Sequence, residues 1–474
     1  MSPLFKIKKL ISFGVSIFRQ YGARGVFIRI FRRNNLHRSI IRFRLLFNSY
    51  VPKSEKVQLW KLLFAPNAIL RFRFLGKIMR ERGILHVVRK ALSLLRAGTF
   101  FSYLRHALSL QHSKVAEDTQ ILLVANDLSW VSHIYRGSVF ERALSNLGFK
   151  VETISESDIV NLADLPSSLR CIYFFRTGVI PEELAWWKSV RNSIVIGYDT
   201  DDLIFDSEIY TLENVPGLNH VNTDTYKHLT GHYLKRQQLM ISEAEILSSP
   251  TTAICDAYKK ISSGTTVRIP NIYLDLIKPY HRVQIYESDD FVIGYASGTK
   301  THDGDFQVCK ESIWQFMQNN LNAQLEIVGY SPIEVKSIPL SLRNRVNFIK
   351  PVPHNQLLSL IKGWSVNIAP LELNGFTNGK SELKFVHAAL CGVPTIASPS
   401  TSFSQAISNG SNGFLADTRE DWVTCLQNLH SDESLRSSLG ILALETVQTE
   451  YTLNRVQEIL QESLVKILEL KDGH

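Results

Sequence analysis

Cysteine is scarce in this chain, whose 474 residues include only five. The five lie far apart and form no CxxC pair; they are Cys171, Cys255, Cys309, Cys391 and Cys425. The odd number and the wide spacing argue against a zinc ribbon and against an oxidising compartment. We therefore expect a protein of the cytoplasm.

Acidic residues are almost missing from the first quarter of the chain. Residues 1–115 contain 24 Lys and Arg but only two acids, Glu55 and Glu81, which gives this segment a net charge of +22. The rest of the chain carries −13, and the overall charge of +9 hides this division. A basic segment of this kind is typical of a protein that meets a polyanion, either nucleic acid or an anionic membrane surface.

Long uncharged runs are also missing from the basic segment. Its first apolar stretch, Leu10 to Phe18, has nine residues, about half of the ~20 that a membrane-spanning helix needs. A secretion signal is disfavoured because Arg19 follows this stretch and no small-x-small cleavage site occurs. A longer uncharged stretch at 385–416 contains Pro394 and Pro399, so we interpret it as a buried strand with its loops.

The apolar residues of the basic segment are spaced as on amphipathic helices. Ile84, Val88 and Leu92 fall on one side of a predicted helix, with Arg89 and Lys90 away from it. Such helices bind anionic lipid by burying apolar area and by charge attraction. We expect residues 1–115 to hold the protein peripherally on the inner face of a membrane. Packing of the segment on the folded body is the alternative, and nucleic acid is disfavoured because no RNP, zinc-finger or KH pattern occurs.

From residue 116 onward, short apolar runs alternate with helix-length segments. Continuous apolar runs are typical of parallel strands that helices cover on both faces. One series comprises 121–125, 150–154, 171–175, 193–198 and 245–249, and a second comprises 291–296, 324–328, 345–349, 365–369 and 394–397. The predicted fold class is therefore α/β, with two doubly wound Rossmann-like domains after a basic helical N-terminal segment.

Proline and polar residues separate the two series. Pro270 and Pro279 stand in or beside a segment that we interpret as a linker near 272–288. Residues 451–470 carry apolar side chains at helical spacing and predict one long amphipathic helix. The expected division is a basic segment at 1–115, Rossmann-like domains at 116–280 and 281–450, and a C-terminal amphipathic helix at 451–474.

Two segments that follow strands of the second series suit phosphate binding. Ligands of doubly wound sheets bind beyond the carboxyl ends of strands, where helix N-termini offer NH groups to anions. The segments are SGTKTHDGD at 297–305 and LELNGFTNGKSELK at 371–384. We expect a helix to begin near Gly379 or Ser381, which would put Lys380 and Lys384 one turn apart. The second segment is not a Walker loop, since that pattern needs glycine where Asn374 stands.

The stretch GKSELKFVHAALCGVPTIAS resembles the donor-binding signature of glycosyltransferase family 4, retaining enzymes of the GT-B architecture. The usual form of that signature is a Glu-x7-Glu segment leading into Ala-x-Ala-x-Gly-x-Pro. GYASGTKTHDGDF is likewise similar to the first strand and loop of the donor domain in a bacterial subgroup. The resemblance covers roughly residues 120–470, more strongly in the second domain, and leaves residues 1–115 outside.

The resemblance implies a nucleotide-sugar site in the second domain and an acceptor site in the first. It makes Lys300 a ligand of the diphosphate, and it places Gly379 and His387 where the family usually has its two glutamates. An imidazole can bond a ribose hydroxyl but cannot supply a fixed negative charge. We expect Lys300 and Lys384 to act in catalysis by stabilising the departing diphosphate, so that neither a metal nor another cofactor is required. The expected donor-binding residues are Gly298, Thr299, His302, Gly379, Lys380, Ser381, Glu382 and His387.

Acidic residues of the first domain follow the strand in IGYDTDDLIFD. We expect Asp202 to act in catalysis and Asp201 to bind the acceptor in preference to a metal, with capping of the next helix as the alternative. Arg136, in the segment SHIYRG after the first strand, is expected to hold an anionic acceptor. Pairing of Arg136 with Glu141 at the surface is the alternative.

These features together predict a glycosyltransferase of the retaining, hexosyltransferase type. It would move a sugar from a nucleotide-diphosphate sugar to a lipid-linked or polysaccharide acceptor in bacterial envelope glycan synthesis, such as lipopolysaccharide assembly. Two alternatives stay open. One is a nucleotide-sugar epimerase or hydrolase on the same fold, and the other is a non-catalytic, membrane-associated subunit, which the missing glutamates allow.

Overall fold

The computed structural model describes most of the chain after residue 114. The described residues are 115–125, 131–156, 165–178, 194–215, 218, 221, 223–274, 290–298, 304–331 and 333–472. The predicted basic segment lies outside them, and so does most of the predicted linker. Residues 115–474 form one compact unit.

The first domain is built on a parallel sheet of six strands in the order β2-β1-β3-β4-β5-β6. The strands are β1 (Ile121–Ala125), β2 (Val151–Ser155), β3 (Cys171–Phe175), β4 (Val195–Asp199), β5 (Ile246–Ser249) and β6 (Thr265–Arg268). The helical elements between them are α7 (Val131–Tyr135), α8 (Gly137–Asn146), α10 (Thr223–Lys227), η3 (His228–Tyr233), α11 (Leu234–Glu243) and α12 (Thr252–Lys259).

The second domain repeats the plan with a parallel sheet in the order β12-β11-β10-β7-β8-β9. Its strands are β7 (Phe291–Ser297), β8 (Ala323–Gly329), β9 (Val346–Ile349), β10 (Val366–Ala369), β11 (Thr395–Ala397) and β12 (Phe414–Leu415). Its helical elements are α13 (Gln307–Asn319), η6 (Val335–Ser337), η7 (Leu340–Arg345), α14 (His354–Ile361), η8 (Thr377–Gly379), α15 (Leu383–Leu390), α16 (Thr401–Ala406), α17 (Arg419–Ser431) and α18 (Glu433–Glu450).

The apolar runs form strands because both faces of each sheet are covered. Successive residues of β1 point to opposite faces: Leu122 and Val124 join the core beside α11 and α12, while Ile121 and Leu123 join the core beside α8. All five residues of this strand are buried. This double burial is the reason that the strands show no polar alternation.

The predicted α/β class with two Rossmann-like domains is confirmed. Ten strands lie at or within two residues of the predicted runs, and β1 and β3 match them fully. Strands β6 and β12 were not predicted, because TTVR and FL are short edge segments without an apolar run. The predicted domain boundaries at 280 and 450 stay predictions.

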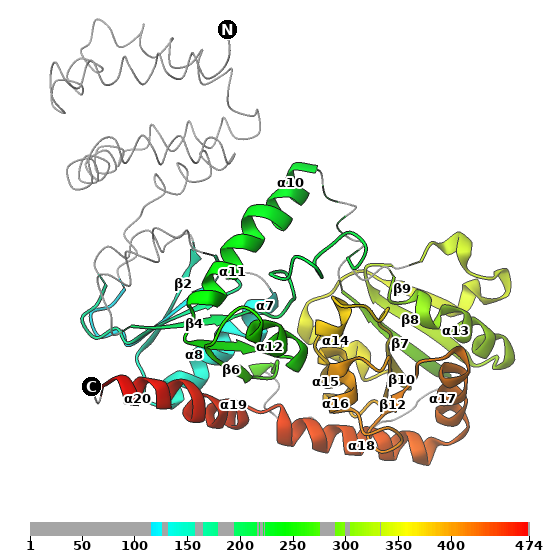
Figure 1. The fold of residues 1–474 in the computed structure, drawn as a ribbon. Coiled ribbons are helices and arrows are strands. Elements are labelled where there is room, and N and C mark those ends of the chain that lie inside the picture. Colours follow the sequence, from blue (N-terminus) through cyan, green and yellow to red (C-terminus); the bar gives the residue numbers. More distant parts are fainter. Residues whose placement is uncertain are drawn as a thin grey trace, which may run out of the picture. The chain divides into compact units, whose positions relative to one another are not determined.

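The chain ends on the first domain. The predicted amphipathic helix is α19 (Leu453–Leu460), continued by η9 (Gln461–Val465) and α20 (Lys466–Asp472), and Thr452 caps it. Val456, Leu460, Leu464 and Leu468 join the core on the α8 side of the first sheet. Helix α18 instead packs on α15 of the second domain. Figure 1 shows these red elements passing from one domain to the other.

Candidate active site

Loops at the carboxyl ends of strands from the two sheets touch one another. In the first domain they follow β4, β5 and β6, and in the second domain the segment between β10 and α15 meets them. Thr251 Oγ1 donates to the carbonyl of Gly379 at 3.3 Å, and Asn271 Nδ2 donates to Ser381 Oγ at 3.1 Å. The predicted donor-binding residues Gly379 and Ser381 therefore lie against loops of the first domain, at the strand ends where doubly wound sheets bind their ligands.

Asp202 stands between two cations. Lys380 Nζ of the second domain lies 2.6 Å from Asp202 Oδ1, and Arg176 Nη1 lies 3.1 Å from Asp202 Oδ2. Arg176 also contacts Asp201 at 3.0 Å. Burial raises the pKa of Asp201, while the Arg176 charge opposes this and the Asp202 charge adds to it. Each carboxylate is thus charge-balanced by a side chain of this chain.

Gly379 sits where the backbones approach closely. A Cβ at this position would come within 2.7 Å of Leu203 Cδ1 and near Ile254 in the first domain. Residues 377–379 form a short 3₁₀ turn, and Lys380 is extended toward Asp202. Helix α15 begins at Leu383 with Glu382 as its N-cap, two residues after the expected start near Ser381, so Lys380 lies outside the helix that carries Lys384.

Lys384 lies in the first turn of α15, and its amine is buried. Among the described residues its Nζ has no hydrogen-bond partner, and it lies 4.7 Å from the centre of the Tyr295 ring. Burial lowers the pKa of Lys384, and the nearby Asp305 charge partly opposes this. A buried amine without a hydrogen-bond acceptor, at the start of a helix, is prepared to receive an anion.

His387 is engaged by other rings. Its Nε2 lies 2.9 Å from His354 Nε2 and 3.3 Å from the hydroxyl of Tyr135 in the first domain. The ring of Tyr273 stacks on that of His354 with centres 4.0 Å apart. Burial, followed by the influence of His354, lowers the pKa of His387 to about 3, so the imidazole is neutral at ordinary pH. The expected ribose contact of His387 stays a prediction.

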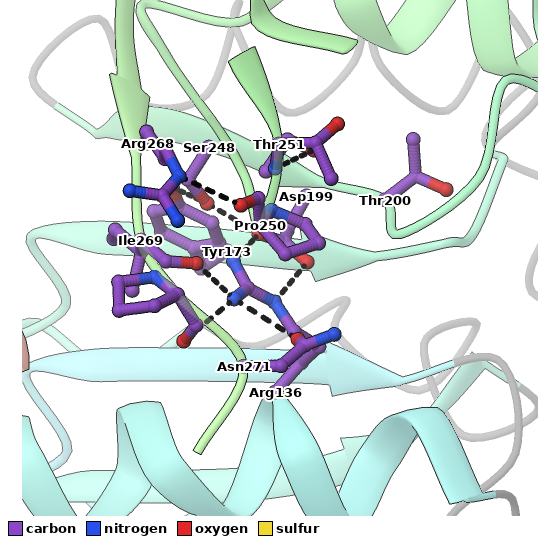
Figure 2. Close-up of polar contacts among 12 residues, drawn as sticks. Arg136, Tyr173, Asp199, Thr200, Ser248, Pro250, Thr251, Arg268, Ile269 and Asn271 are labelled. Atoms are coloured by element: carbon purple, nitrogen blue, oxygen red, sulfur yellow. Dashed lines mark hydrogen bonds and ion pairs between the residues drawn. The ribbon is translucent and has the colours of Figure 1, made fainter. Parts of the chain in front are cut away.

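Arg136 is buried and bonded to other residues of the first domain. Its guanidinium donates to both oxygens of Asp199, at 3.0 and 2.5 Å, and both residues are almost fully buried. It also donates to the carbonyl of Ile269, as Figure 2 shows, and to that of Pro270. The alternative pairing with Glu141 at the surface is wrong, because Arg136 pairs with Asp199 inside the domain. The expected contact of Arg136 with an acceptor stays a prediction.

Glu382 is likewise tied inside the protein. Its Oε1 accepts hydrogen bonds from Arg268 at 2.7 Å and from the Tyr451 hydroxyl at 2.6 Å. Glu382 is the N-cap residue of α15, so these two bonds fix the start of the helix that carries Lys384. The partners come from β6 and from the junction of α18 and α19, and the sequence gives no sign of this contact.

Part of the predicted site cannot be compared with the structure. Thr299, Lys300 and His302 lie outside the described residues, and Gly298 is exposed at the end of β7. The expected convergence of Lys300 with Lys384 therefore stays a prediction. Within the described part of the chain, no group of three or more His, Cys, Asp or Glu could hold a metal ion, and no helix is long and apolar enough to cross a membrane.

Two functional candidates escaped the sequence analysis. Arg176 directly follows β3, and its position after a buried strand is the same signal that singled out Asp201. His354 is the second candidate, and it lies in the first turn of α14. Its contact with His387 joins residues 33 positions apart, and no linear pattern announces it.

A family model agrees with this arrangement. Residues 291–432 match the family described as glycosyl transferases group 1. The match covers β7 to α17 and therefore includes Lys384, His387 and the segment around Gly379. A search of curated proteins gives no match.

Solved structures resemble this chain over about three quarters of its length. Sucrose-phosphate synthase from Thermosynechococcus elongatus has a TM-score of 0.54 at 15% identity, covering 75% of this chain and 100% of that one. Anabaena HepE in complex with UDP-glucose has a TM-score of 0.50 at 14% identity, covering 73% and 99%. A glycosyltransferase from Rickettsia africae has a TM-score of 0.50 at 14% identity, covering 76% and 99%. At these identities the likeness establishes the GT-B fold, while family 4 membership and retention of configuration stay predictions.

Proposed function

We propose that this protein transfers a sugar from a nucleotide-diphosphate sugar, held by the second domain, to an acceptor held by the first. The observation that carries the proposal is the buried amine of Lys384. It lies within the family match, has no hydrogen-bond acceptor among the described residues, and stands at the N-terminal turn of α15. A diphosphate would supply the missing acceptor oxygens.

The chemistry that this geometry favours is electrostatic. As the bond between the sugar and the diphosphate breaks, negative charge grows on the leaving oxygen. The Lys384 ammonium and the NH groups at the start of α15 would stabilise that charge, and Lys300 would assist according to the family resemblance. The oxygen of the acceptor hydroxyl bonds to the anomeric carbon as the bond to the diphosphate breaks, and the hydroxyl proton is released with the nucleoside diphosphate. We propose retention of configuration and a hexosyl donor on the resemblance alone.

The acceptor in this proposal is a lipid-linked glycan or a polysaccharide of the bacterial envelope. The support is the charge of +22 on residues 1–115, which suits an anionic membrane face on which lipid-linked substrates reside. In this proposal the carboxylates of Asp201 and Asp202, which Arg176 contacts, accept hydrogen bonds from hydroxyl groups of the acceptor. No metal or other cofactor enters the proposed reaction.

Nucleotide-diphosphate sugars should raise the melting temperature of the full chain in a concentration-dependent way. Binding to the native state stabilises it by RT ln(1 + [L]/Kd), about 2.7 kcal/mol at a hundredfold excess over Kd. A thermal-shift series with UDP-, GDP-, dTDP- and ADP-sugars identifies the donor. The corresponding nucleoside monophosphates are the control, since they lack the diphosphate that Lys384 is proposed to bind.

Three further results would favour one of the alternative functions. No stabilisation by any nucleotide sugar, confirmed by calorimetry, would favour the non-catalytic subunit. Release of free sugar at an equal rate with and without acceptor would favour a hydrolase, and conversion of the donor without nucleotide release would favour an epimerase.

The full chain should sediment with vesicles that contain anionic lipid, and it should not bind neutral phosphatidylcholine vesicles. Each basic residue near an anionic surface contributes about 1 kcal/mol, or about fivefold in binding. Replacement of Arg89, Lys90 and Arg96 by Gln should therefore weaken vesicle binding by about a hundredfold. Unchanged sedimentation of this variant, or equal binding to neutral vesicles, would contradict the membrane proposal.

A further inference from the structure

Arg176 has an unusual backbone conformation at the end of β3. Its φ of 50° makes it the one non-glycine residue with positive φ among those that the structure describes. The left-handed region costs a residue with a Cβ about 1–2 kcal/mol, so it is kept only where surrounding contacts enforce it. Strain of this kind tends to gather at functional sites.

Three hydrogen bonds enforce the turn at Arg176. Its NH donates to the carbonyl of Asp199 at 2.8 Å, which ties the turn to the end of β4. Its carbonyl accepts from the Tyr233 hydroxyl at 2.8 Å and from Gln237 Nε2 at 3.3 Å. Contacts with other elements of the first domain therefore hold the backbone of Arg176 in this conformation.

The turn aims the guanidinium across the ends of β3 and β4 at Asp201 and Asp202. Nη1 lies 3.0 Å from Asp201 and 3.1 Å from Asp202, and Asp202 continues the chain of contacts to Lys380 at 2.6 Å. The side chains of Arg176, Asp202 and Lys380 keep 16 to 21% of their surface exposed. The cluster is thus accessible to a ligand while remaining largely enclosed.

The charges around Asp201 explain why a cation is needed there. Burial and the Asp202 charge raise the pKa of Asp201, whereas Arg176 and, more weakly, Lys380 lower it. Asp199, which pairs with Arg136, also raises the pKa of Asp201, but less strongly. Among the residues that the structure describes, the other titratable groups that face the cluster are Tyr198, Tyr210 and Tyr233. Without Arg176, two adjacent carboxylates would share a poorly solvated space and one would tend to protonate.

We propose that Arg176 is a positioning residue for the acceptor, because it holds the Asp201–Asp202 pair ionised and oriented toward the acceptor hydroxyl. The carboxylates, not the guanidinium, touch the acceptor in this arrangement. The inference rests on the proposed function. It assigns the acceptor side of the reaction to the charge cluster of the first domain, and the donor side to Lys384.

The test compares Arg176→Gln and Arg176→Lys with the wild-type full chain. The donor is the nucleotide sugar that gives the largest thermal shift, and nucleotide release is measured with octyl glucoside or with water as the acceptor probe. For Arg176→Gln we expect donor affinity within twofold of wild type by calorimetry, and nucleotide release reduced 10- to 30-fold. The acid limb of its pH profile should move to higher pH, because loss of the cation raises the pKa of the carboxylates. Arg176→Lys should restore the acid limb.

The results distinguish failure of the inference about Arg176 from failure of the proposed function. An unchanged acid limb in Arg176→Gln, or donor affinity lost in the same proportion as turnover, would overturn the inference and leave the proposed function in place. A wild-type chain that neither binds nor consumes any nucleotide sugar would overturn the proposed function and the inference with it. Should Arg176→Gln fail to fold, Asp201→Asn provides the same comparison, since it removes a carboxylate without touching the strained turn. Retained turnover in Asp201→Asn would contradict the inference.

Discussion

Lys384→Met should lower kcat/KM for the donor by about 10² or more while leaving the fold intact or slightly more stable. Methionine keeps the length and apolar contact over the Tyr295 ring but removes the amine. Loss of one charge-stabilising donor from a site of this kind costs a factor of about 10² to 10³ in rate. Steady-state kinetics and thermal unfolding of the same preparations measure the two effects.

The sign of the stability change follows from the lowered pKa of Lys384. The unfolded chain binds a proton at this amine more tightly than the folded chain does, so the amine destabilises the fold below the unfolded pKa. That penalty disappears as pH rises through the unfolded value. Removal of the amine should therefore stabilise the protein at neutral pH, which separates a binding residue from a structural one.

A matched control is Lys336→Met, because Lys336 is largely exposed and pairs with Glu334 at the surface. It should change neither kinetics nor stability appreciably. Near-normal kcat/KM in Lys384→Met would remove the residue from the site.

Arg136→Met should reduce the free energy of unfolding by about 3–5 kcal/mol. The substitution leaves the Asp199 carboxylate buried without its cation, and breaking one side of a buried ion pair costs about this much. It also frees the carbonyls of Ile269 and Pro270, on the segment that leads toward the second domain. Denaturant unfolding of the full chain measures the loss.

The double variant Arg136→Met/Asp199→Asn is the control for this prediction. It removes the uncompensated charge, so it should recover part of the stability that the single variant loses. A loss below about 1 kcal/mol in the single variant would show that the pair is more hydrated than its burial indicates. Nucleotide-sugar binding to the folded fraction should be normal, because Arg136 lies in the first domain and the nucleotide sugar is proposed to bind the second.

The strands could be predicted well from the sequence, because strands that are buried on both faces are continuous apolar runs. Runs such as ILLVA and CIYFF permit few other structures, and both fall on strands without error. The edge strand β6 could not be found in this way, since TTVR is partly exposed and its partner β5 lies 16 residues or more away. Edge strands depend on pairing more than on their own composition.

The candidate site was harder, since its contacts join distant parts of the chain. The sequence indicated that Lys380 and Lys384 lie one helical turn apart, but Lys380 precedes α15 and pairs with Asp202, while Lys384 is buried against Tyr295. The pairing of Arg136 could not be predicted for a similar reason, because its partner Asp199 lies 63 residues away. Charge and position after a strand locate a site, whereas tertiary pairing decides which side chains remain available.

The return of the C-terminal helix to the first sheet limits how the two domains can move. The polypeptide crosses between them twice, once from β6 to β7 and again at Tyr451, between α18 on the second domain and α19 on the first. The hydroxyl of Tyr451, at the second crossing, is bonded to Glu382 at the start of α15. A shift of α15 relative to the returning chain would therefore stretch or break this bond.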